Sequence, residues 1–121
     1  MSFAVWAGVA GVGGLGALAR FLLDAAIAGR AGRTFPFGTL AVNLSGAFVL
    51  GLFTGLALAG NALLLAGTAT VGSYTTFSTW MLESHRLAED GDSRLAMINV
   101  AVSLLVGVGA AALGRLIGMH A

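Results

Sequence analysis

The stretch GSYTTFSTWM, residues 72–81, places five serine and threonine hydroxyls in the middle of an otherwise apolar part of the chain. Consecutive hydroxyl residues weaken a helix because they compete for the carbonyls one turn earlier, and Gly67 and Gly72 add backbone freedom. At membrane depth, a broken helix is tolerated only where its freed carbonyls and amides find partners in protein, water or an ion. The stretch therefore predicts an unwound segment that presents backbone groups to a ligand.

The rest of the chain predicts an all-α membrane protein. Of its 121 residues, 58% are hydrophobic and only 9% are charged, whereas about a quarter are charged in soluble domains. Residues 34–82 contain no charged side chain, and a single helix over this range would be roughly 70 Å long, more than twice a hydrocarbon core of about 30 Å. The range must therefore cross twice, with a turn at Gly60-Asn61. Uncharged runs at 1–19 and 95–114 bring the expected number of transmembrane helices to four.

We expect these helices over residues 3–28, 37–59, 62–88 and 93–118, with the interruption near mid-membrane in the third. Pro36 suits the entry to the second helix, because a missing N–H is harmless in the first turn. We expect the first run to be a span and not a signal peptide, since it lacks a positive leading region and carries Arg20 at its far end. Residues 1–121 show no linker or second domain, and the absence of cysteine excludes disulfides and thiolate metal sites.

Small residues recur every four positions on two predicted helices: Ala47, Gly51 and Gly55, and then Ala110, Gly114 and Gly118. In lipid, such faces let helix backbones approach closely, so they predict packing seams. We expect these faces to offer more contact than one four-helix chain can use, which favours an oligomer. Because four such helices enclose little space, we expect any pathway to lie at a subunit interface.

Polar side chains inside a membrane are functional candidates, because unpartnered ones are costly there. Asn43 follows Thr39 by one turn on the second helix, and its amide suits either a ligand or an interhelical hydrogen bond. Phe77 and Trp80 are three residues apart and share one side of the third helix. They fit either ordinary packing or a path lined by the positive edges of aromatic rings, which favour an anion.

The charged residues favour structural roles. Arg20 and Asp24 are four residues apart on the first helix, which predicts a paired couple near the membrane interface. Glu83, His85 and Arg86 lie at the end of the third helix, where two potential ligands are too few for a metal site. A net charge of +1 without a basic cluster argues against nucleic acid. No nucleophile, base and orienting group can be combined from these residues, so we do not expect an enzyme.

Three motifs in order, GALARF (16–21), FPFGTLAVNLSGAFVLG (35–51) and GSYTTFSTWMLE (72–83), resemble the signatures of the Fluc/CrcB fluoride channels. The fourth helix adds a weak match around Ser103 and Gly107. The resemblance implies an antiparallel, dual-topology dimer in the bacterial inner membrane, with two fluoride pathways along the subunit interface. It also implies passive export of toxic fluoride, which a negative cell interior drives outward by about 2.3 kcal/mol per charge per 100 mV.

The resemblance also implies roles for individual residues. The fluoride pathway would comprise Asn43, Phe77, Trp80, Thr39, Thr79 and Ser103. A structural sodium ion at the dimer centre would be held by the backbone carbonyls of Gly72 and Thr75, while Arg20 and Glu83 match structural or vestibule positions. Neutral donors and ring edges would replace the water shell of fluoride, whereas a row of arginines would hold the ion too tightly to conduct.

Two residues depart from the family pattern: Trp80 stands where the family usually has phenylalanine, and Asn99 where we expect tyrosine. The arginines are also uneven. One side of the membrane is predicted to hold Arg30, Arg33, Arg86 and Arg94, with Arg20 near its edge, and the other side to hold Arg115. The positive-inside rule then favours one orientation, with both termini outside. A homodimer of inverted copies and a heterodimer with an oppositely oriented paralogue therefore both stay open.

Two further alternatives stay open from the sequence. One is a non-conducting membrane assembly subunit, which the bulk of Trp80 would favour. The other is a small multidrug transporter, which also has four helices. Proton-coupled export of a cationic drug needs a carboxylate in the membrane core, and the first helix has none before Asp24.

Overall fold

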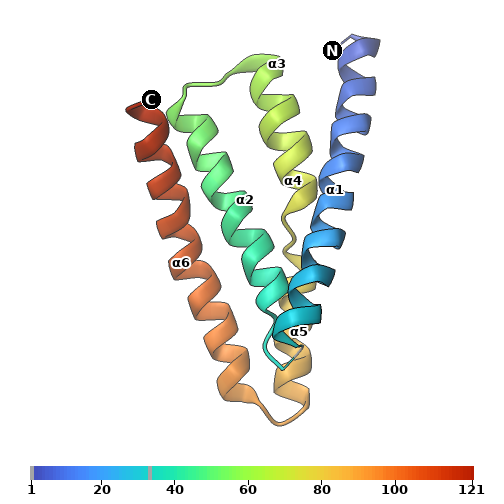
Figure 1. Cartoon of the computed structure of the whole chain (residues 1–121), viewed down its shortest axis with the longest axis vertical. Coiled ribbons are helices and arrows are strands. Elements are labelled where there is room, and N and C mark those ends of the chain that lie inside the picture. Colours follow the sequence, from blue (N-terminus) through green and yellow to red (C-terminus); the bar gives the residue numbers. More distant parts are fainter. Residues whose placement is uncertain (1, 33) are drawn as a thin grey trace.

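Four segments of the chain run side by side along the long axis of the molecule (Figure 1). The computed structural model describes residues 2–32 and 34–121, and within these ranges it contains helices and no strand. Three of the described helices are long and apolar enough to cross a membrane: α1 (Phe3–Ala31), α2 (Phe37–Gly55) and α6 (Ser93–Met119). Both termini and the α2–α3 connection lie at the same end, as four successive crossings require (Figure 1).

The remaining segment, residues 60–89, is built from short pieces and is called the broken segment below. It comprises α3 (Gly60–Leu63), the π-helix η1 (Leu64–Val71), α4 (Gly72–Tyr74) and α5 (Ser78–Glu89). Residues 75–77 are not helical, and Thr75 is extended with φ −78° and ψ 159°. The interruption predicted from the hydroxyl cluster is therefore present, at the centre of GSYTTFSTWM.

The end of the second helix was predicted wrongly. It ends at Gly55 and not at 59, because Ala57 adopts a positive φ of 58° and turns the chain there. The Leu58 N–H donates to Phe53 O at 3.2 Å and the Ala57 N–H to Thr54 O at 3.0 Å, which together close a Schellman motif. Glycine usually takes the left-handed position of this motif, so an alanine there gives no sequence signal. The predicted turn at Gly60-Asn61 is instead the start of α3.

The other predicted ends differ from the structure by a few residues. The first helix continues to Ala31, where Gly32, at φ 76°, donates its N–H to Ala28 O. The broken segment begins at Gly60 and its last helix ends at Glu89, while α6 extends to Met119.

The predicted glycine seams are confirmed between α2 and α6. A Cβ atom built on Gly51 would lie 2.1 Å from Ala111 O, and one on Gly114 would lie 2.1 Å from Phe48 O. The two backbones approach too closely for any side chain at these positions. The small residues of α2 and α6 are therefore used for packing within one chain. They no longer support the expectation of an oligomer.

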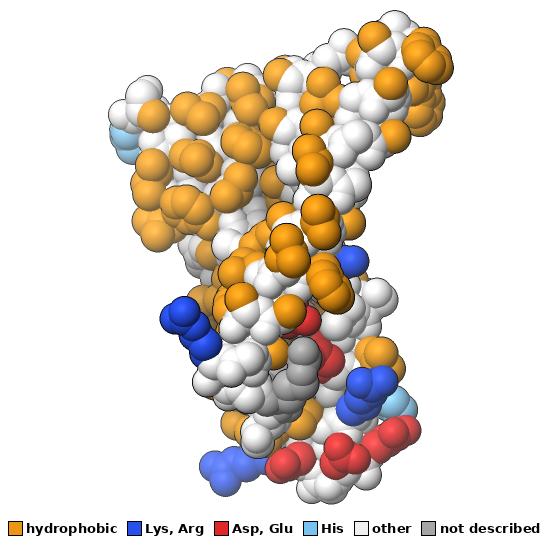
Figure 2. Space-filling view, turned by 45° about the vertical axis from the view of Figure 1, so that its right-hand side comes forward, with side chains coloured by type: hydrophobic (Ala, Val, Ile, Leu, Met, Phe, Trp, Pro, Cys, Tyr) orange, Lys and Arg blue, Asp and Glu red, His pale blue; other side chains and the backbone are white. Residues whose placement is uncertain are grey.

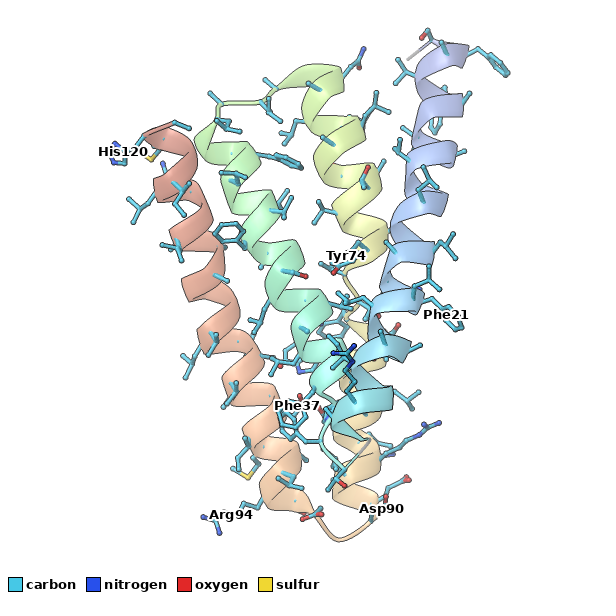
Figure 3. All side chains as sticks on the ribbon, viewed as in Figure 1. Phe21, Phe37, Tyr74, Asp90, Arg94 and His120 are labelled. Atoms are coloured by element: carbon cyan, nitrogen blue, oxygen red, sulfur yellow. The ribbon has the colours of Figure 1, made fainter. Side chains whose placement is uncertain are left out.

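In Figure 2, hydrophobic side chains gather over the upper part of the visible face, and charged side chains gather in its lower part. The charged end carries the α5–α6 turn, where Arg94 and Asp90 lie opposite the end with His120 (Figure 3). Arg33, one of the arginines predicted on that side, lies outside the described residues. The interior is small, and its two largest fully buried side chains are Val42 and Asn99. An apolar exterior around a partly polar interior is the distribution expected of a protein surrounded by lipid.

Candidate functional site

The side chain of Asn43 is bound to the backbone at the break. Its Nδ2 donates to Thr76 O at 2.9 Å, and the Thr76 N–H donates to its Oδ1 at 2.8 Å. An asparagine amide has the same kinds of donor and acceptor as a peptide bond. Asn43 therefore pairs with the unwound residues 75–77 as a peptide group of a neighbouring backbone would. One N–H of the Asn43 amide is used in this pair, and the second is left for another acceptor.

This pairing changes which carbonyls of the broken segment are occupied. In a continuous helix the Thr76 N–H would donate to Gly72 O, but here it donates to Asn43. The Thr79 N–H would likewise donate to Thr75 O, but here it donates to Thr76 Oγ1 at 3.2 Å. Gly72 and Thr75 therefore both lose the donor that a continuous helix would supply to their carbonyls.

Two residues that follow Asn43 on α2, Ser45 and Gly46, also support the break. The hydroxyls of Ser45 and Tyr74 are 2.8 Å apart, and Figure 3 shows Tyr74 beside the break. A Cβ atom on Gly46 would lie 2.2 Å from Thr75 Cγ2, so only glycine lets the unwound strand come this close. The sequence indicated the break and Asn43 separately, but it did not indicate Ser45 or Gly46 as their supports.

A groove of about 600 Å³ runs between α2, the broken segment and α6. It is lined by five of the residues that the sequence assigned to a site: Asn43, Gly72, Thr75, Trp80 and Ser103. The Oγ atom of Ser103 is buried and has no hydrogen-bond partner within residues 2–32 and 34–121. A buried hydroxyl without a partner is costly, so Ser103 offers a donor that a bound anion would satisfy.

A separate cavity of about 170 Å³ holds three other predicted residues, Arg20, Thr39 and Thr79, together with Thr76. Asn43 lines the groove and its partner Thr76 lines this cavity, so their hydrogen-bonded pair lies between the two spaces. The hydroxyl of Thr39 donates to Glu83 Oε1, which connects the cavity to the predicted vestibule residue. The structure thus divides the predicted residues between two neighbouring spaces.

The predicted aromatic pair has one buried and one exposed member. The rings of Phe77 and Trp80 are 5.6 Å apart at an angle of 82°, an edge-to-face arrangement. Trp80 is only 9% exposed, whereas Phe77 is 69% exposed on the surface of the chain. The indole N–H donates to Asn99 O at 3.4 Å. The indole N–H thus has its acceptor within the protein.

The predicted pairing of Arg20 with Asp24 is absent. A contact between a basic and an acidic side chain is found instead on α5, where His85 Nε2 lies 2.7 Å from Glu89 Oε1. Asp24 instead packs against the first turn of α2, where a Cβ atom on Gly38 would lie 2.0 Å from Asp24 Oδ1. The positive end of a helix dipole attracts a carboxylate, which accounts for this placement.

Sequence reasoning missed a buried polar cluster between α5 and α6. The Asn99 Nδ2 donates to Ser84 Oγ at 2.8 Å, and Ser84 Oγ donates to Trp80 O at 2.9 Å. Asn99 is 1% exposed. The sequence could have indicated Asn99, because an asparagine is unusual in an apolar helix. It could not have indicated its partner Ser84, which lies on another helix.

The chain matches one family model and is similar to several named proteins along most of its length. Residues 7–115 match the family model described as CrcB-like protein, Camphor Resistance. A protein of Mycolicibacterium paratuberculosis named fluoride-specific ion channel FluC 2 is 58% identical over 93% of this chain and 92% of its own length. A FluC 2 of Mycobacterium tuberculosis is 53% identical over 95% of this chain and 91% of its own length. A FluC 1 of Symbiobacterium thermophilum is 45% identical over 92% of this chain and 93% of its own length.

Proposed function

The chain belongs to the CrcB-like family and is a multi-pass integral membrane protein, and from this premise we propose that it is a fluoride-selective channel. The observation that carries the proposal is the 58% identity to a fluoride-specific ion channel over more than nine-tenths of both chains. These relatives are named as channels and not as enzymes or drug transporters. Fluoride would leave the cell passively, down its electrochemical gradient.

Selectivity would come from neutral donors placed along the groove. Fluoride is small and strongly hydrated, so a pathway must replace its water with closely spaced hydrogen-bond donors. The second N–H of Asn43 and the unpartnered hydroxyl of Ser103 both belong to the lining of the groove. The ring edges of Phe77 and Trp80 would add a weak positive field, and Thr39 and Thr79 would extend the path through the neighbouring cavity. Several weak sites permit passage, whereas one strong site would trap the ion.

A sodium ion would be held by the carbonyls of Gly72 and Thr75. Carbonyl oxygens are ligands for hard cations, and the two carbonyls have lost their helical donors to Asn43 and to the Thr76 hydroxyl. The residues therefore fit the ion. When bound, the cation would supply a fixed positive charge that favours an anion nearby. Two carbonyls are too few for a complete site, so further oxygens would come from a second subunit.

The second subunit would be an inverted copy or an oppositely oriented paralogue. The exposed ring of Phe77 and the open groove support an interface on this side of the chain. The relatives include proteins numbered FluC 1 and FluC 2, which supports the existence of paralogues. In an antiparallel dimer, Arg20 and Glu83 would lie near the mouths of the two pathways.

Flux through purified protein in liposomes tests the function. We expect fluoride to leave vesicles under a membrane potential set by potassium and valinomycin, while chloride efflux stays at the level of protein-free vesicles. Equal efflux of both anions would contradict a selective channel. Absence of fluoride efflux from the chain alone, restored by a co-reconstituted paralogue, would favour the heterodimer. Absence in both preparations would favour a non-conducting assembly subunit.

A further inference from the structure

Trp80, Ser84 and Asn99 form a closed ring of hydrogen bonds between α5 and α6. Asn99 Nδ2 donates to Ser84 Oγ, Ser84 Oγ donates to Trp80 O, and Trp80 Nε1 donates to Asn99 O, at 2.8, 2.9 and 3.4 Å. All three residues are buried. Each side chain donates once within the ring, so removal of one group leaves another buried group without its partner.

The ring determines where the indole lies. The two shorter bonds fix the backbone of Trp80 relative to α6, and the longer and weaker bond limits rotation of the indole itself. The indole in turn meets the ring of Phe77 edge to face. Asn99 and Ser84 do not line the groove, whereas Trp80 does. They therefore act on the groove only through Trp80.

The next turn of α6 carries Ser103. Asn99 lies one turn before Ser103, and in an α-helix its carbonyl accepts the Ser103 N–H as well. Trp80 and Asn99, the two residues that depart from the family pattern, are also in direct contact.

We propose that Asn99 and Ser84 are positioning residues that hold the Trp80 indole at the wall of the groove, and that Trp80 and Asn99 form a matched pair. The consequence for transport rests on the proposed fluoride pathway, but the positioning itself does not. An indole held by a buried asparagine would set the width of the groove more sharply than an aromatic ring held by packing alone.

Tryptophan fluorescence tests the positioning without reference to transport. The chain has two tryptophans, and Trp6→Phe leaves Trp80 as the single fluorophore. In this background we would compare Asn99→Leu, which keeps the volume but removes the donor, with Ser84→Ala and with Ser84→Thr, which keeps the hydroxyl. Thr54→Ala is the matched control, because it also removes one side-chain hydrogen bond to a carbonyl but lies on α2, away from Trp80.

We expect Asn99→Leu and Ser84→Ala each to shift Trp80 emission to longer wavelength and to increase quenching by acrylamide. Their double variant should change little more than either single one, because both break the same ring. Ser84→Thr and Thr54→Ala should keep the parent spectrum. In liposomes, Asn99→Leu should slow fluoride efflux about fivefold, the factor that corresponds to one lost hydrogen bond, and should have little further effect once Trp80→Phe is present.

The outcomes separate the two proposals. If Ser84→Ala keeps the parent emission and quenching, the positioning is overturned, whatever the effect on thermal stability. Ser84→Ala and Ser84→Thr decide the question even where Asn99→Leu does not fold. If the spectra change as expected but the parent protein carries no fluoride, the positioning stands and the proposed function fails. If the parent protein conducts fluoride but no spectrum changes, the proposed function stands and the positioning fails.

Discussion

Asn43 and Thr76, on two different segments of the chain, exchange two hydrogen bonds of 2.9 and 2.8 Å. The pair links α2 to the unwound strand and separates the 600 Å³ groove from the 170 Å³ cavity. It also removes the donor that Gly72 O would have in a continuous helix. One side chain thus shapes the break, frees a carbonyl and places its remaining N–H on the proposed pathway.

Asn43→Leu should abolish fluoride efflux, because it removes the amide donors while keeping a similar volume. It should also destabilise the protein by about 1–3 kcal/mol, since the N–H and carbonyl of Thr76 lose their partners. Efflux assays and thermal unfolding measure the two effects. Thr54→Ala is the control, because it removes a hydroxyl of the same helix that donates to Gly51 O and does not contact the break. Normal efflux through folded Asn43→Leu protein would rule out a role of Asn43 in conduction.

The proposed sodium site predicts that sodium should raise the thermal stability of the protein. A ligand that binds only the folded state stabilises it by RT ln(1 + [L]/Kd), so the melting temperature should rise with sodium concentration. The measurement is thermal unfolding in sodium chloride, with N-methylglucamine chloride of equal ionic strength as the control. Equal melting temperatures in both salts would speak against a bound sodium ion at Gly72 and Thr75.

Local signals explain what the sequence could predict. The hydroxyl cluster indicated the break and the lack of charge indicated the spans, because both depend on neighbouring residues only. The Asn43–Thr76 pair could not be predicted, since it depends on the register between α2 and the unwound strand. The ring of Trp80, Ser84 and Asn99 likewise depends on packing of α5 against α6. The end of α2 was missed because Ala57, and not a glycine, takes the positive φ.

Gly114→Ala should destabilise the chain, whereas Gly109→Ala on the same helix should not. A Cβ atom on Gly114 would lie 2.1 Å from Phe48 O, while one on Gly109 meets nothing within 4 Å. Forcing a methyl group into the α2–α6 seam should cost about 1–3 kcal/mol. Thermal unfolding of the two variants measures the difference. If both variants have the same melting temperature, the seam between α2 and α6 is looser than the structure indicates.

The arginine distribution predicts one preferred orientation. Arg30, Arg86 and Arg94 belong to the helix ends away from the termini, and Arg115 belongs to the opposite end of α6. Juxtamembrane arginines favour the cytoplasmic side, so a reporter fused to the C-terminus should be found mainly outside. Co-expression with a paralogue should then be needed for flux. Equal populations of both orientations would instead support a homodimer of inverted copies.

Ser103→Ala should slow fluoride efflux without loss of stability. The Ser103 hydroxyl has no partner within the described residues, so its removal breaks no hydrogen bond of the folded chain. If the hydroxyl donates to the passing anion, its loss should lower the efflux rate about five- to tenfold. Ser103→Thr keeps the hydroxyl and should keep most of the flux. A drop in melting temperature with unchanged efflux would show that Ser103 is bound within the protein and takes no part in conduction.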